Sequence, residues 1–203
     1  MKRILAIAII ALLSLVSAVH AGESPARNIV ASLHGTLLDV MIAAAELGFE
    51  GRRNYLAPAM TESYDMTHIA RGATGRYWRR ASDEQKQRIV DAITRLSITI
   101  YAARFDGFSG ERFRTLSEEP GPRGTVLVKT EIVKSDGDTV ALNYLMRDTD
   151  GVWRIIDVYL DGIYSEVALK RADYAGILKR SGFDGLFRAI EKKIVEIERE
   201  GRK

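Results

Sequence analysis

The segment from Ser24 to Leu47 carries more apolar residues than a helix at a protein surface can use. Ser24 followed by Pro25 is a typical helix start, and Gly48 is a typical stop. At 100° per residue the apolar side chains cover more than half of the helix circumference, whereas a surface helix needs a stripe about 100° wide. The pattern therefore predicts a helix that is buried on two sides or faces something apolar that is not protein. The apolar residues are Ile29, Val30, Leu33, Leu37, Leu38, Val40, Met41 and Ile42.

A second helix with the same property is predicted between Ser82 and Phe105. Ser82 and Gln85 have the spacing of a capping box, and Asp106-Gly107 ends the segment. Its apolar residues also cover a wide arc. A thick core and an internal apolar cavity both explain such arcs, and composition does not separate them because both use the same residue types. The residues in the arc are Ile89, Ile93, Leu96, Ile98, Ile100, Tyr101 and Phe105.

Strand patterns replace helical ones in the middle of the chain. Residues 125–134 and 139–147 alternate between apolar and polar, and residues 152–160 are apolar on both faces, as in a covered strand. Asp136-Gly137 and Asp150-Gly151 are hairpin turns between them. With a shorter strand near residues 112–117, these segments predict three or four antiparallel strands in a meander.

Helices are predicted on both sides of this meander. Residues 52–75 form short helices broken near Pro58, Asp65 and Gly72, and residues 165–180 and 184–199 form two more, separated by Gly182. No internal repeat or domain boundary is visible. The predicted fold class is therefore α+β, with a twisted antiparallel β-meander and helices packed on one face of it.

Residues 1–21 are predicted to be a signal peptide rather than part of the fold. Lys2 and Arg3 precede 16 mostly apolar residues, and Val19-His20-Ala21 places small residues where a signal peptidase cleaves, before Gly22. A retained membrane anchor is the alternative, but the apolar run is shorter than the roughly 20 residues that span a bilayer. Residues 22–203 then form a single domain.

Composition excludes several classes of function. The absence of cysteine excludes disulfides, iron–sulfur clusters, thiolate zinc sites and a thiol nucleophile. Removal of Lys2 and Arg3 from 30 basic side chains leaves 28 against 27 acidic ones, so the exported chain has a net charge near +1. A nucleic-acid-binding protein shows a stronger positive excess. We therefore expect an exported protein that works in a bacterial periplasm and binds no nucleic acid.

Catalytic, metal-binding and cofactor-binding motifs are not recognisable. His34 and His68 lack partners at metal-ligand spacing, so we interpret both as structural. Asp157 lies within an apolar strand. It is either a general base in an apolar pocket or a buried carboxylate held by backbone donors or by an arginine at the end of the sheet, and we favour the second interpretation.

Two arginines are candidates for contact with a lipid headgroup. Arg76 belongs to the run GRYWRR at residues 75–80, which is either a membrane-interface patch or ordinary packing of Tyr77 and Trp78 beside solvated arginines. Arg104 lies in the apolar arc near the end of the second long helix. It is either a partner for the helix dipole, which we favour, or a phosphate ligand at the mouth of a pocket.

Two long stretches resemble a known family. GRYWRRASDEQKQRIVDAITRLSITIYAARFDGFSGERF (Gly75 to Phe113) is similar to the central segment of the MlaC-like periplasmic family, the soluble components of phospholipid ABC transport systems, also called toluene-tolerance proteins. LNYLMRDTDGVWRIIDVYLDGIYSEVALKRADYAGILKRSGFDGLF (Leu142 to Phe187) is similar to its closing segment, including Trp153, Asp157, Gly162, Ser165 and GFDGL. The run from Tyr101 to Phe113 most resembles the hopanoid-associated HpnM branch.

The resemblance implies a monomeric carrier, not an enzyme, that shuttles phospholipid or hopanoid across the periplasm between an inner-membrane ABC transporter complex and an outer-membrane lipoprotein complex. It also implies that helices and sheet enclose a deep apolar cavity and that no cofactor is used. Our own inference for the cavity lining takes residues from the sheet and from the second long helix: Ile98, Tyr101, Phe105, Val126, Val128, Leu142, Tyr144 and Met146.

Two rival hypotheses remain open. One is a small cone-shaped α+β enzyme that uses Asp157 on an apolar substrate. The other is an interaction module that bridges transporter components and binds no lipid.

Overall fold

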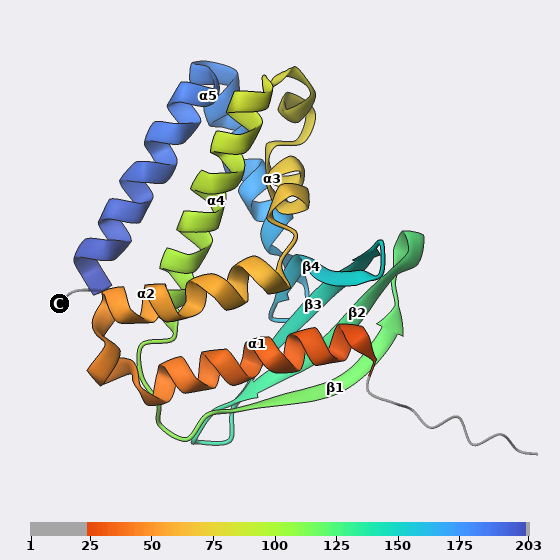
Figure 1. Cartoon of the computed structure of the whole chain (residues 1–203), viewed down its shortest axis with the longest axis vertical. Coiled ribbons are helices and arrows are strands. Elements are labelled where there is room, and N and C mark those ends of the chain that lie inside the picture. The colour runs from red at the N-terminus through yellow and green to blue at the C-terminus, as the bar shows by residue number, and fades with distance from the viewer. Residues whose placement is uncertain (1–23, 202–203) are drawn as a thin grey trace, which may run out of the picture.

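The computed structural model describes residues 24–201, and the predicted signal peptide lies outside this range. One antiparallel sheet has helices packed on one of its faces, so the predicted α+β class is confirmed (Figure 1). The helices are α1 (Pro25–Ile42), α2 (Ala44–Ser63), α3 (Met66–Thr74), η1 (Gly75–Arg80), α4 (Asp83–Arg104), η2 (Pro122–Gly124) and α5 (Glu166–Gly201). The strands are β1 (Arg112–Pro120), β2 (Thr125–Val133), β3 (Thr139–Thr149), β4 (Val152–Leu160) and β5 (Tyr164–Ser165).

The sheet is a meander with strand order β1-β2-β3-β4-β5, one short strand more than predicted. The β3–β4 turn contains Asp150 and Gly151 at positive φ, as the predicted hairpin requires. Two register shifts interrupt the ladders, one in β1 between Thr115 and Ser117 and one between Leu145 and Met146 of β3. Such bulges bend a strand and increase its twist, which gives the sheet a curved face for the helices to cover.

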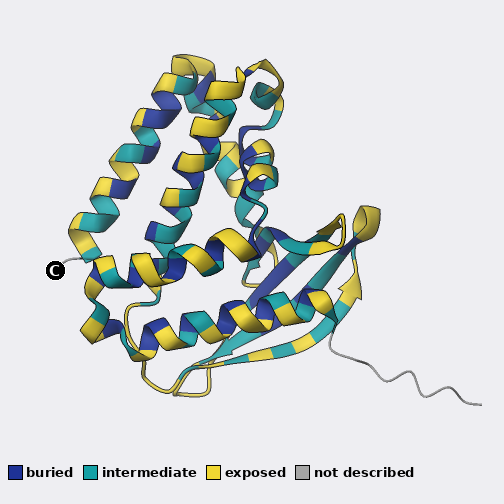
Figure 2. Cartoon of the chain, in the orientation of Figure 1, coloured by how far each residue is buried: buried dark blue, intermediate teal, exposed yellow. Residues whose placement is uncertain are grey.

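Helix α1 lies along the sheet but buries only one side (Figures 1 and 2). Its buried positions follow a single i, i+3/i+4 stripe, while Ile42, at the end of the predicted apolar arc, is 60% exposed. The helix also ends at Ile42 rather than at Leu47, and Gly48, at φ 59°, breaks the following helix instead. The predicted two-sided burial is therefore wrong for this helix.

Helix α4 is the central helix, and its central position explains why its apolar residues cover a wide arc. The capping box between Ser82 and Gln85 is present, and the helix ends at Arg104, one residue before the predicted end. It packs against α2, α3 and α5, so apolar side chains on several sides find partners.

Of the three breaks predicted between α1 and α4, the one near Asp65 is confirmed, because α2 ends at Ser63 and Asp65 caps the start of α3. The breaks predicted at Pro58 and Gly72 are wrong. Helix α2 continues through Pro58, between the fully buried Leu56 and Met60, and ends at Ser63. Packing on both sides of the proline outweighs its missing hydrogen bond. Gly72 lies inside α3, and the chain turns at Gly75.

Arg52 is a buried link between helices that the sequence analysis missed. Its Nε donates to the carbonyl of Ala102 at 2.9 Å, and its Nη1 donates to the carbonyl of Ala44 at 3.2 Å. Ala102 lies in the last turn of α4, whose carbonyls lack helical partners and attract cations. Arg52 thereby ties α2 to the C-terminal end of α4.

A row of aromatic rings crosses the interior from the sheet to α4. His34 stacks on Phe113, with 4.2 Å between ring centroids, and its Nε2 lies 3.0 Å from the hydroxyl of Tyr144. The row continues from Phe113 through Phe105 to Tyr101, with centroids 6.3 and 5.5 Å apart. Burial lowers the pKa of His34 from 6.5 to about 4, so this imidazole is uncharged at neutral pH.

The burial of His34 predicts a dependence of stability on pH. The unfolded chain takes up a proton on this residue near pH 6.5, but the folded protein does so only near pH 4. The free energy of unfolding therefore falls as the pH drops from 7 to 4, by up to about 3 kcal/mol from this residue. Urea denaturation across this range should show a smaller fall for His34→Gln, which does not titrate. Identical pH profiles for the two proteins would contradict this assignment.

Candidate functional site

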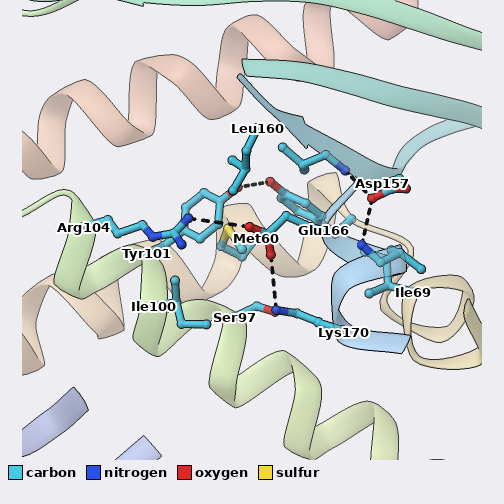
Figure 3. A pocket seen from close by; sticks show the side chains of 13 residues that line it. Met60, Ile69, Ser97, Ile100, Tyr101, Arg104, Asp157, Leu160, Glu166 and Lys170 are labelled. Atoms are coloured by element: carbon cyan, nitrogen blue, oxygen red, sulfur yellow. Dashed lines mark hydrogen bonds and ion pairs between the residues drawn. The ribbon is translucent and has the colours of Figure 1, made fainter. Parts of the chain in front are cut away.

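An apolar pocket lies where the ends of α2 and α4 meet α3, β4 and the start of α5 (Figure 3). The residues that α2, α4 and α5 contribute recur at spacings of three or four positions, so they lie on one face of each helix. On α4 these are Ser97, Ile100, Tyr101 and Arg104, which share one helix face. The other lining residues are Met60, Tyr64, Ile69, Asp157, Val158, Leu160, Glu166, Val167 and Lys170.

The pocket is small. Its volume is about 60 Å³, whereas pockets that hold small ligands usually measure about 300 Å³ or more. It has room for a few groups the size of a methylene but not for an acyl chain. Within residues 24–201, the helices and sheet therefore form a small, partly open pocket at this place and not the deep cavity that the family resemblance implies.

Two tyrosines meet at one wall of the pocket. The hydroxyls of Tyr64, at the end of α2, and Tyr101, on α4, are 2.6 Å apart. Burial raises the pKa of Tyr101 to about 12 and raises that of Tyr64 as well, so both phenols keep their protons at neutral pH. This hydrogen bond joins α2 to α4 across the pocket.

The rim of the pocket is charged. The carboxylate of Glu166, in the first turn of α5, lies 3.3 Å from the ammonium of Lys170 and 3.8 Å from the guanidinium of Arg104 (Figure 3). The side chain of Arg104 is 54% exposed, so its pairing is loose and solvent-screened. Two cations thus share one carboxylate beside an apolar interior.

Asp157 holds the corner between β4 and α5. One carboxylate oxygen accepts hydrogen bonds from the backbone N–H of Val158 at 2.8 Å and of Val167 at 3.1 Å. The other accepts one from the hydroxyl of Ser165 at 2.5 Å. Ser165 in turn accepts a hydrogen bond from the N–H of Ala168, as an N-cap does. These contacts are those of the structural interpretation favoured above.

The sequence-predicted lining residues lie on the same side of the sheet but not all at the pocket. Tyr101 lines it, and Phe105 continues the aromatic row. Ile98 and Val126 are partly buried against the core. Val128, Leu142, Tyr144 and Met146 are buried on the face of the sheet that the helices cover.

The two headgroup candidates are separated. Arg104 lies at the rim of the pocket, whereas Arg76 lines a different hollow on the outer side of α3. Sequence reasoning missed Lys170 and Glu166. Their spacing of four residues at the start of a helix was the available signal.

Among residues 24–201, no group of three or more histidine or acidic side chains is arranged to hold a metal ion. No helix in the same range is long and apolar enough to cross a membrane.

The fold, a meander covered by helices on one face, is shared with a solved phospholipid-binding protein. That protein, from Ralstonia solanacearum and in complex with a phospholipid, superposes with a TM-score of 0.76 at 19% identity, over 86% of this chain and 99% of its own. The sequence pattern of the MlaC protein family matches residues 33–192, so the chain belongs to this family. No curated protein matches the sequence.

The contacts of Asp157 predict its contribution to stability. Asp157→Ala leaves three donors at the β4–α5 corner without their acceptor, which should lower the free energy of unfolding by about 1–3 kcal/mol. Asp157→Asn keeps an acceptor oxygen and should cost less. In chemical denaturation the exposed control Asp173→Ala should stay within about 0.5 kcal/mol of the parent. An Asp157→Ala protein as stable as this control would refute the corner role.

Proposed function

We propose that the protein is a periplasmic lipid carrier, whose cargo is a phospholipid with its acyl chains in the apolar interior and its phosphate at the rim. The observation that carries the proposal is the pocket itself, with apolar walls from four helices and β4 beside two cations that share one carboxylate. Membership of the MlaC protein family and the fold shared with a phospholipid-bound protein support it.

Loading requires the pocket to widen. The present volume of about 60 Å³ excludes an acyl chain, so helices and sheet must separate there when cargo enters. The hydrogen bond between Tyr64 and Tyr101 closes one wall, and a bond of this kind contributes about 0.5–1.5 kcal/mol. Each methylene that leaves water gains about 0.8 kcal/mol. A few methylenes therefore offset the loss of this contact.

The aromatic row gives the acyl chain a direction. From Tyr101 at the pocket, the rings of Phe105, Phe113 and His34 lead to Tyr144 on the sheet. Rotation of the rings in this row would open a path from the pocket toward the sheet residues that we predict to line the cavity. The predicted lining set thus becomes the inner part of the loaded cavity, with Val128, Leu142 and Met146 at its floor.

The rim supplies the headgroup contact. A lipid phosphate that displaces Glu166 would pair with Lys170 and Arg104, both of which already converge on an anion. Arg76 has no part in this contact, because it lines another hollow.

The remaining parts of the proposal follow from the family and the sequence. The carrier moves as a monomer between an inner-membrane ABC transporter complex and an outer-membrane lipoprotein complex. Hopanoid is a second cargo to be tested, given the resemblance of residues 101–113 to the HpnM branch. The structural contacts of Asp157 favour a carrier over an enzyme that uses this residue.

Filling the pocket should block loading. Ile100→Trp adds an indole to the α4 face of the pocket, and the variant should lose most of the lipid that co-purifies with the parent, as measured by native mass spectrometry without detergent. The matched control is Ile42→Trp, at a position of α1 that is 60% exposed, and it should keep its lipid. A folded Ile100→Trp protein with a full lipid load would refute the assigned pocket, and a parent that never carries lipid would refute the carrier.

The rim should set the affinity for phosphate-bearing lipid. Replacing Arg104 and Lys170 with Gln removes both cations, and the affinity for a fluorescent phospholipid should fall about tenfold, the low end for charge-assisted bonds at a partly exposed site. The control replaces Arg95 and Lys193 with Gln, which removes the same charge from exposed ion pairs with Glu191 and Glu196. Equal affinities for the two double variants would exclude this headgroup site.

A further inference from the structure

A second, open hollow on the outer side of α3 is lined by arginines. Its volume is about 580 Å³, and α3, η1, β3 and α5 all contribute to it. We call it the arginine groove. Its lining contains five arginines and no carboxylate: His68, Arg71, Gly72, Gly75, Arg76, Trp78, Arg79, Arg147 and Arg171.

Several of these guanidinium groups are held in place by neutral partners. The Nε of Arg171 donates to the carbonyl of Gly72 at 2.7 Å, and Arg76 donates to the hydroxyl of Tyr77 at 3.3 Å. Arg147 pairs with Asp65 at 3.1 Å, the one ion pair in the groove. Among residues 24–201, neither Arg71 nor Arg79 finds a carboxylate within ion-pair distance. The groove therefore keeps most of its positive charge.

This charge is local. The whole chain has 30 basic and 27 acidic side chains, so the five arginines reflect a concentration at one place rather than a basic protein. His68 adds no charge at neutral pH, because burial, with a smaller contribution from Arg147, lowers its pKa. The groove is thus an arginine site for an anion.

We propose that the arginine groove docks the protein onto a membrane surface rich in anionic phospholipid headgroups. Guanidinium groups bind phosphate oxygens bidentately, and five of them spread over four elements suit several phosphates rather than a single ion. Trp78 lines the groove while partly packed on the core, and Trp beside Arg is typical of membrane interfaces.

Features of both interpretations of GRYWRR are present at residues 75–80. Tyr77 and Trp78 do pack against the core, as the ordinary interpretation requires. Arg76 and Arg79 nevertheless line the groove with Arg71 of the preceding helix α3 and with two arginines that are distant in the sequence, Arg147 of β3 and Arg171 of α5. Membrane docking is separate from cargo binding, since the groove and the lipid pocket share no lining residue.

The experiment is co-sedimentation of the exported, mature protein with vesicles. Binding should be clear for phosphatidylcholine vesicles that contain phosphatidylglycerol, weak for phosphatidylcholine alone, and reduced by salt, which screens exposed charges. The double variant Arg71→Gln/Arg79→Gln should bind the anionic vesicles about tenfold more weakly. The control Arg188→Gln/Arg199→Gln removes two exposed charges from the C-terminal half of α5 and should bind like the parent.

Three outcomes would overturn the proposal. Equal losses in both double variants would show that total charge, not the groove, drives binding. Binding of inorganic phosphate without attachment to vesicles would make the groove an ion site. If the protein binds no vesicle, the groove does not dock on membranes, and an acidic protein becomes the favoured partner. Co-purified lipid is measured on the same proteins, so a failure of docking is distinguishable from a failure of the carrier proposal.

Discussion

Hydrocarbon in water is the constraint on which the proposed function depends. Two acyl chains with about thirty methylenes would cost on the order of 24 kcal/mol if left wet, at about 0.8 kcal/mol for each methylene. A carrier must therefore enclose nearly the whole of both chains. The walls that α2, α3, α4, β4 and α5 contribute to the pocket are apolar, as this enclosure requires. The volume of the pocket, about 60 Å³, is too small for the chains.

Fixed and separable parts are both visible around the pocket. Asp157 of β4 fastens the start of α5 with two hydrogen bonds, from the hydroxyl of Ser165 and the N–H of Val167, and Asp65 joins the start of α3 to the sheet through its backbone and through Arg147. Tyr64 and Tyr101 are joined by one hydrogen bond and an edge-on ring contact, and Arg52 adds a buried hydrogen bond from α2 to the carbonyl of Ala102 in α4. We expect the frame of β4, α3 and α5 to keep its shape and the pocket to widen on the α4 side, where these contacts have to loosen.

The sequence predicts the strands, turns and capping box well because each depends on local pattern. The hairpins at Asp136-Gly137 and Asp150-Gly151 and the cap at Ser82 need only near neighbours in the chain. Pro58 was expected to break a helix and does not, because packing of the flanking residues decides there. The width of an apolar arc also does not predict how many sides of a helix are buried. Ile42 of α1 is exposed, whereas the arc of α4 is used on several sides, and periodicity alone does not tell a central helix from an outer one.

The site was less predictable than the fold. Tyr101 and Arg104 could be predicted as site residues from the sequence, because both lie in the apolar arc of one long helix. The convergence of Lys170 and Arg104 on Glu166, and of Arg147 and Arg171 on the arginine groove, joins segments that are distant in the chain. No local pattern reports such long-range contacts.

The most direct test measures whether the pocket widens around its cargo. The chain has no cysteine, so Phe108→Cys and Ile163→Cys can be spin-labelled selectively at positions that are 46% and 70% exposed. They lie in the chain four residues beyond Arg104 and three before Glu166, the two residues that form an ion pair at the rim. Pulsed electron paramagnetic resonance should show a longer distance between the labels in phospholipid-loaded protein than in lipid-free protein. One bound phospholipid with an unchanged distance distribution would contradict the account.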